Sequence, residues 1–139
     1  MISQTAEYAL RAMVALANTR NALTSREIAE DAKVPVDYLA KILRLLARAG
    51  LVRAQRGRHG GFESARPTNQ LTVLEVVSAV DPVQRIKTCP LGLAAHSENL
   101  CPLHRAIDDA ARSVEEAFRK TTIDSLIDHS VCKGATCDA

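Results

Sequence analysis

The chain has 139 residues, of which 47% are hydrophobic and 24% charged, and its formal net charge is only +2. This length supports one compact domain, and the core must be aliphatic because aromatic residues make up 3% of the chain. No apolar stretch approaches the roughly 20 residues that cross a bilayer, and the opening MISQTAEYAL lacks the basic and apolar regions of a signal peptide. We therefore expect a cytoplasmic protein with no membrane partner.

The first half of the chain predicts three helices. Apolar residues recur at helical spacing over residues 3–18. Thr24 and Glu27 form a capping-box pattern, which starts a short second helix. Pro35 then permits a third helix to begin, and Gly50 ends it.

A hairpin and a fourth helix follow. Residues 51–66 alternate apolar and polar positions on both sides of the turn-rich RGRHGG, which predicts a short β-hairpin. Thr72 and Glu75 form a second capping box before a helix that ends at Asp81. Three helices followed by a hairpin predict a mainly α fold, the winged helix-turn-helix, in which a late helix enters the major groove of DNA.

Positive charge is concentrated in the third helix and the hairpin of this predicted winged helix-turn-helix. Residues 33–58 hold seven Lys or Arg against the single acid Asp37, which indicates a polyanionic partner. On the third helix, aliphatic side chains gather on one side and cations on the other, although an ordinary solvated helix has the same pattern. The expected contacts with double-stranded DNA are Tyr38, Lys41, Arg44, Arg48, Arg53, Arg56, Arg58 and His59.

The last long helix is expected from Pro102 to Asp128. Its apolar positions follow a four-three alternation, as in helices that pack against another helix: Leu103, Ile107, Ala110, Val114, Ala117 and Thr121. The partner helix could belong to the same chain, but a DNA reader gains a defined half-site spacing by pairing, so we expect a homodimer. The predicted units are a DNA-binding domain (1–82), a cysteine-containing sensor loop (83–104) and a dimerisation helix with a tail (105–139).

These parts, in this order, resemble the Rrf-two family of bacterial transcription regulators over nearly the whole chain. The opening EYALRAMVALA resembles the first helix of the family, TSREIAEDAKVPVDYLAKILRLLARAGLV its helix-turn-helix, and RGRHGGF its wing tip. The resemblance implies a homodimeric DNA-binding repressor or activator that dimerises through its long C-terminal helices. It also implies DNA contacts at Tyr38, Lys41, Arg44 and Arg56.

The loop TCPLGLAAHSENLCPLH, residues 88–104, is the candidate sensor. Several members of the family hold an iron–sulfur cluster here through three cysteines; Cys89 matches the first, the segment from Cys101 to His104 resembles the last, and the middle cysteine is absent. Some members add an acid from the first helix of the partner, and Glu7 occupies the matching position. The resemblance therefore implies a mixed-ligand 2Fe-2S or 4Fe-4S cluster. Its ligands would be Cys89, Cys101, His104 and Glu7, with His96 able to replace one of them.

Other interpretations of the loop stay open. The two loop thiols bracket eleven residues, a spacing that a disulfide switch without a metal could close. A zinc-binding interaction module is another alternative, and its zinc site would need more ligands, such as Cys132 and Cys137. Glu7 could simply pair with Arg11 one helical turn away. An enzyme is not expected, because no Cys-x-x-Cys lies near a βαβ pattern and no Ser-His-Asp order is present. Nucleotide binding is not expected either, because RGRHGG lies between strands instead of before a helix.

Overall fold

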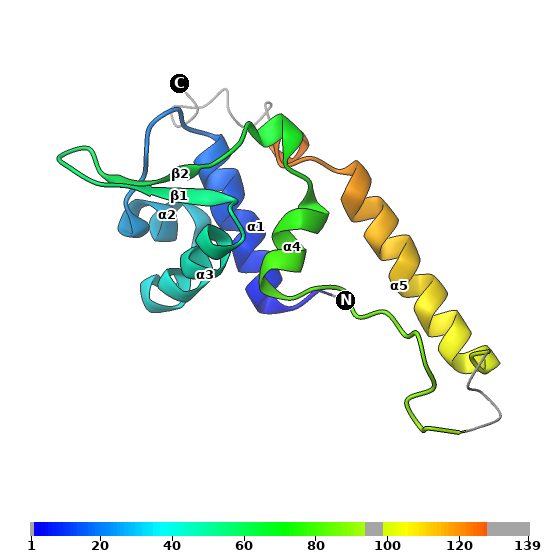
Figure 1. The fold of residues 1–139 in the computed structure, drawn as a ribbon. Helices are drawn as coiled ribbons and strands as arrows, with labels where there is room; N and C mark the ends of the chain where they lie inside the picture. The colour runs from blue at the N-terminus through cyan, green and yellow to red at the C-terminus, as the bar shows by residue number, and fades with distance from the viewer. Residues whose placement is uncertain (1, 94–98, 128–139) are drawn as a thin grey trace.

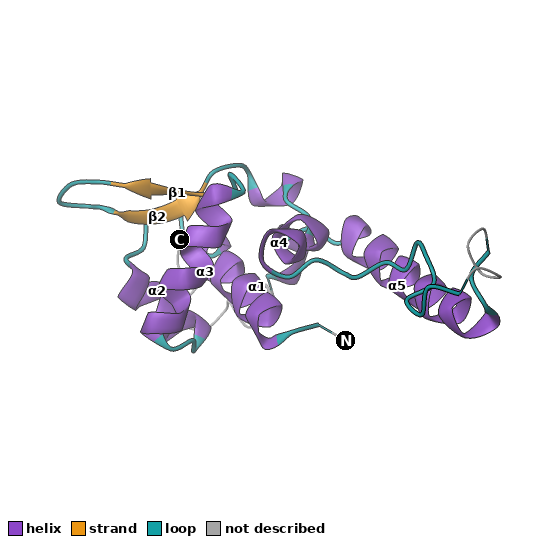
Figure 2. Cartoon of the chain, turned by 60° about the horizontal axis from the view of Figure 1, so that its bottom comes forward, coloured by secondary structure: helices purple, strands orange, loops and turns teal. Residues whose placement is uncertain are grey.

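The computed structural model describes residues 2–93 and 99–127, and it confirms a mainly helical fold with one small hairpin (Figure 1). Short 3-10 turns lie at Thr68–Gln70 and Asp124–Leu126. The helices and strands are α1 (Gln4–Ala17), α2 (Ser25–Ala32), α3 (Val36–Arg48), β1 (Val52–Gln55), β2 (Gly61–Ser64), α4 (Val73–Val80) and α5 (Pro102–Lys120). The hairpin lies at one end of the molecule and α5 at the opposite end (Figure 2).

Both predicted capping boxes are present. Thr24 Oγ1 accepts the backbone N–H of Glu27 at 3.2 Å, and the Glu27 carboxylate accepts the backbone N–H of Thr24 at 2.7 Å. Thr72 and Glu75 repeat the arrangement at 3.2 and 2.9 Å. The bond from the Thr24 backbone lowers the pKa of Glu27 from its usual value. By contrast, α3 begins after Pro35 and has no side-chain cap.

The core is aliphatic, as the composition predicts. Ala6, Ala9 and Ala12 on α1 are fully buried, and their small side chains let the other helices approach closely. The aliphatic side of α3 is buried as expected. Its core side chains are Leu39, Ile42, Leu43 and Leu46. No polar or charged side chain is buried within the described residues, so hydrophobic burial dominates the stability of this domain.

The segment between α1 and α2 joins the hairpin to the helices through an isolated bridge at Leu23. Val52 pairs with Ser64 and Gln55 with Gly61 in the antiparallel ladder. The Leu23 N–H donates to the carbonyl of Phe62 at 2.9 Å, and the Phe62 N–H donates back at 2.7 Å. A Cβ at Gly61 would lie 2.3 Å from the Leu23 carbonyl oxygen, and the φ of Gly61 is +152°, so only glycine fits where the hairpin meets this segment.

The long helix α5 is shorter than predicted. It ends at Lys120, so the expectation of a continuous helix to Asp128 is wrong over residues 121–127. The backbone instead turns onto the start of α4: Val73 N–H donates to the Thr121 carbonyl at 2.8 Å, and Ile123 N–H donates to the Leu71 carbonyl at 2.8 Å. Ile123 is fully buried. We call residues 121–123 the C-terminal hook.

An ionic latch joins the segment after α4 to α5. Arg85 binds Asp108 through two hydrogen bonds of 2.7 and 2.9 Å and Glu115 through one of 2.9 Å, and the Ile86 N–H also donates to Asp108 at 2.9 Å. The bonds from Arg85 lower the pKa of Asp108 to about 2. This latch fixes the segment along two turns of α5.

Among the described residues, no helix has the length and apolar character that a membrane crossing requires.

Candidate DNA interface and cysteine loop

The outer side of α3 carries the predicted cations. Lys41, Arg44 and Arg48 are all exposed, opposite the buried aliphatic side of the same helix. None of the three forms an ion pair with another residue in the described part of the chain. Their charges therefore face solvent without a bonded counter-ion, and this side of α3 can receive a polyanion.

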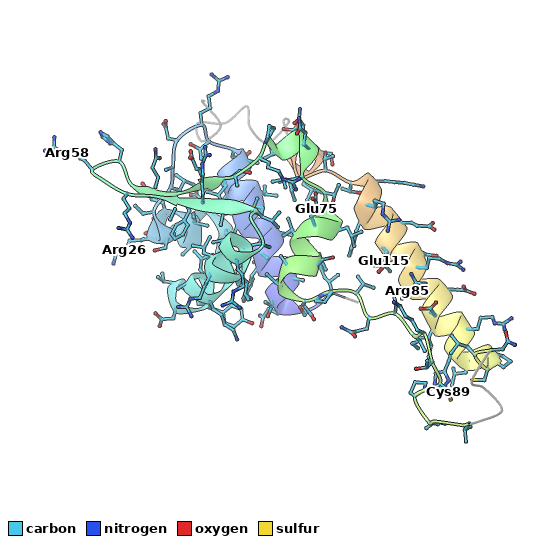
Figure 3. The ribbon with its side chains drawn as sticks, viewed as in Figure 1. Arg26, Arg58, Glu75, Arg85, Cys89 and Glu115 are labelled. Atoms are coloured by element: carbon cyan, nitrogen blue, oxygen red, sulfur yellow. The ribbon has the colours of Figure 1, made fainter. Side chains whose placement is uncertain are left out.

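The hairpin of β1 and β2, with its turn, is the wing, and its cations lie in two different settings. Arg53 on β1 forms an ion pair of 2.6 Å with Glu63 on β2, directly across the ladder. Arg56, Arg58 and His59 are exposed at the tip. Figure 3 shows Arg58 at the far end of the wing, where a thin tip can approach a phosphate backbone closely.

The α2 helix adds one exposed arginine that the sequence prediction did not include. Arg26, in the first turn of α2, projects at the same end of the molecule as Arg58 (Figure 3). It lies outside the basic block of residues 33–58 and stands beside Glu27, so a count of local charge did not select it. Its place at the start of the first helix of the helix-turn-helix was the available signal, because that helix crosses the DNA backbone in such motifs.

Tyr38 differs from the other predicted DNA contacts. It is half-buried, and its hydroxyl forms a hydrogen bond with Thr5 Oγ1 on α1. Its ring meets the ring of Tyr8 edge-on, with the ring centres 5.6 Å apart and the planes at 79°. The side chain is therefore directed toward α1, and a contact between its hydroxyl and DNA stays a prediction.

The structure brings two of the predicted loop ligands together. Cys101 immediately precedes α5, and its Sγ lies 3.1 Å from Nδ1 of His104. Both side chains are half-buried. Cys89 is buried and lies at the same end of the molecule as the first turn of α5 (Figure 3). The chain between them includes residues 94–98, and so His96 is outside the described residues.

Glu7 is exposed on α1 and forms an ion pair of 2.5 Å with Arg11, the alternative that the sequence offered. Within residues 2–93 and 99–127, no group of three or more His, Cys, Asp or Glu side chains converges as metal ligands do. Cys132 and Cys137 lie outside the described residues.

Comparison with known proteins gives a consistent picture. The Rrf2 family model, described as an iron-dependent transcriptional regulator, matches residues 2–129. An HTH-type transcriptional regulator of Mycobacterium tuberculosis is 35% identical over 121 residues, covering 83% of this chain and 75% of its own length. One from Aquifex aeolicus is 29% identical over 131 residues and 91% of each chain.

Solved structures agree on the fold. The global cysteine regulator CymR of B. subtilis superposes with a TM-score of 0.74 at 22% identity, covering 91% of this chain and 95% of its own. IscR of T. potens gives a TM-score of 0.77 at 22% identity, with 97% and 92% covered. With the hairpin and the exposed basic side of α3, the match over residues 2–129 shows that this chain belongs to the Rrf2 family of DNA-binding transcriptional regulators, which are not enzymes.

Proposed function

We propose that the chain works as a homodimeric regulator that reads DNA through α3 and the wing and senses redox, nitric oxide or iron–sulfur status through Cys89 and Cys101. The observation that carries the DNA-reading part is the division of α3 into a buried aliphatic side and an exposed cationic side. Such a helix can remain docked on its own domain while its outer side enters the major groove.

Individual roles follow from where each cation lies. Lys41, Arg44 and Arg48 on α3 can reach base edges or the phosphates that flank the groove. Arg56, Arg58 and His59 at the wing tip suit the backbone or a narrow minor groove. Arg53 is paired with Glu63, so we expect it to contribute more to the shape of the wing than to contact with DNA. The test is selection of binding duplexes from a random pool, followed by affinity measurements at several salt concentrations. Failure to select any duplex, or affinity that does not fall with salt, would reject DNA reading by this surface.

The proposed dimer rests on α5. None of its 19 residues is buried, and Leu103 and Ile107 are 65% and 47% exposed. This apolar side adjoins a hollow of about 380 Å³ that also involves α4 and the amino terminus. Its apolar lining is Ile2, Val77, Pro82, Val83, Ala110, Ala111 and Val114. A second copy laid along α5 would cover this apolar surface, which monomeric proteins rarely leave open. Sedimentation equilibrium gives the test, and a monomer at micromolar concentration would reject the dimer.

The sensing part rests on the donor set at the base of α5. Thiolate and imidazole are ligands that iron–sulfur clusters accept, and the Cys101 sulfur and His104 nitrogen already converge at 3.1 Å. With Cys89 and with Glu7 of the partner subunit they supply four ligands. A bound cluster would provide one-electron redox chemistry and reactivity toward nitric oxide. The protein would supply the ligands and a buried thiol at Cys89.

A thiol switch without a metal is the second candidate, favoured by the same Cys101–His104 contact because a nearby imidazole can take up the thiol proton. Zinc binding is a third, weaker candidate. Anaerobic purification, a visible spectrum and metal analysis separate the three. The cluster predicts a coloured protein that contains iron, and Cys89→Ser and Cys101→Ser should each remove the colour. Colourless protein without iron rejects the cluster, and oxidant-dependent DNA binding in that protein identifies the thiol switch.

A further inference from the structure

We infer that Thr5 and Tyr38 form a positioning pair: through their hydrogen bond, α1 fixes the angle at which the DNA-reading helix α3 meets DNA. Through this bond Tyr38 contributes to the specificity of reading by positioning α3. The inference rests on the proposed role of α3 as the reading helix and assigns a role to two residues of the same reading unit.

The start of α3 needs an external support. Its neighbours α2 and α4 each begin with a complete capping box, whereas α3 follows Pro35 and has no side-chain cap. An uncapped first turn leaves its backbone N–H groups without a side-chain acceptor and is prone to fray. Tyr38 lies in this first turn of α3, and Thr5 lies in the first turn of α1. Their hydrogen bond therefore joins the two helix starts directly.

The ring of Tyr38 is supported as well as its hydroxyl. It packs edge-on against Tyr8, a geometry that aromatic pairs favour. Tyr8 is itself held on two sides: its hydroxyl accepts a hydrogen bond of 2.8 Å from Gln4, and the Arg11 guanidinium carbon lies 5.6 Å from its ring centre. Tyr38 thus rests on an ordered patch of α1.

The consequence for DNA reading is geometric. Lys41 stands one turn beyond Tyr38 and projects outward, so a small rotation of the first turn of α3 moves its ammonium group relative to the groove. Hydrogen bonds to base edges depend strongly on distance and angle. Attraction to phosphates does not, because it acts over several ångströms. A loss of positioning should therefore reduce binding to a preferred duplex and leave binding to unrelated DNA intact.

The experiment compares two probes: a duplex selected from a random pool by the wild-type protein, and a shuffled duplex of equal length. Thr5→Val and Tyr38→Phe each remove the hydrogen bond. Each should lower the ratio of the two affinities by about two- to tenfold, the effect of weakening one hydrogen bond from Lys41 to a base edge. The double variant should show no larger loss than either single variant, because both remove the same bond.

Controls separate positioning from general destabilisation. Thr5→Ser keeps the hydroxyl and should restore the wild-type ratio, and Thr68→Val, the same exchange at another half-buried threonine, should not change it. Thermal unfolding verifies that each variant is folded at the assay temperature, and Thr5→Ala replaces Thr5→Val if the latter is not. A ratio that stays at the wild-type value in the Thr5 variant, or additive losses in the double variant, would overturn the inference. If the wild-type protein selects no duplex, the proposed DNA reading fails instead.

Discussion

Replacement of Ile123 by Ala tests the C-terminal hook most directly. Ile123 is fully buried, and its backbone N–H is bound to the carbonyl of Leu71. Removal of a fully buried Ile side chain to Ala costs about 2–5 kcal/mol, from lost burial and the cavity that is left. Because the hook lies at the edge of the core and can partly collapse, we expect about 3 kcal/mol. For a chain of this size that loss lowers Tm by about 10 °C.

The measurement is urea unfolding followed by circular dichroism, at several protein concentrations because any dimer adds to the apparent stability. Leu126→Ala is the matched control: it lies three residues further along and is 39% exposed, so we expect less than about 1 kcal/mol. A loss below about 1 kcal/mol for Ile123→Ala, or equal losses for both variants, would refute the docking of the hook on α4.

Three further predictions concern DNA binding, pH and assembly. Lys41→Ala should weaken binding to the selected duplex more than binding to unrelated DNA, because we expect Lys41 to contact a base edge; equal weakening of both, with the slope of log affinity against log salt reduced by about one, would assign it to a phosphate instead. Asp108 has a lowered pKa of about 2 in the folded protein, so its contribution to stability is complete above about pH 4 and is lost as the pH falls toward 2. The stability difference between wild type and Asp108→Asn, from urea unfolding, should shrink across that window, and a constant difference would contradict the latch. Ile107→Glu should shift sedimentation toward the monomer, whereas Arg105→Glu, on the opposite side of α5, should not; equal effects would argue against this interface.

The parts of the fold that the sequence predicted well are those with local causes. Thr24 and Glu27 stand three residues apart, so the capping box can be recognised without knowledge of the rest of the chain. The two sides of α3 follow in the same way from helical periodicity over residues 36–48. The exposed cations of the candidate DNA interface were predicted for this reason.

The features that the sequence predicted wrongly or did not reveal depend on contacts between residues that are distant in the chain. The four-three alternation continues to Thr121, but α5 ends at Lys120 because the hook pairs with residues about fifty positions earlier. The bond between Thr5 and Tyr38 spans 33 positions and the latch from Arg85 to Asp108 spans 23. No periodicity shows such partners, because each depends on how the helices pack.

Because the hook holds its carboxyl end, α5 has the mechanics of a lever. The helix is pinned at its carboxyl end, where the hook joins α4, and its other end carries Cys101 and His104. At about 1.5 Å per residue, its 19 residues form an arm of about 28 Å. A displacement of about 2 Å at the cysteine end then turns α5 about its pivot by about 4°. A displacement at the cysteine end would therefore act as a torque on the first turn of α4.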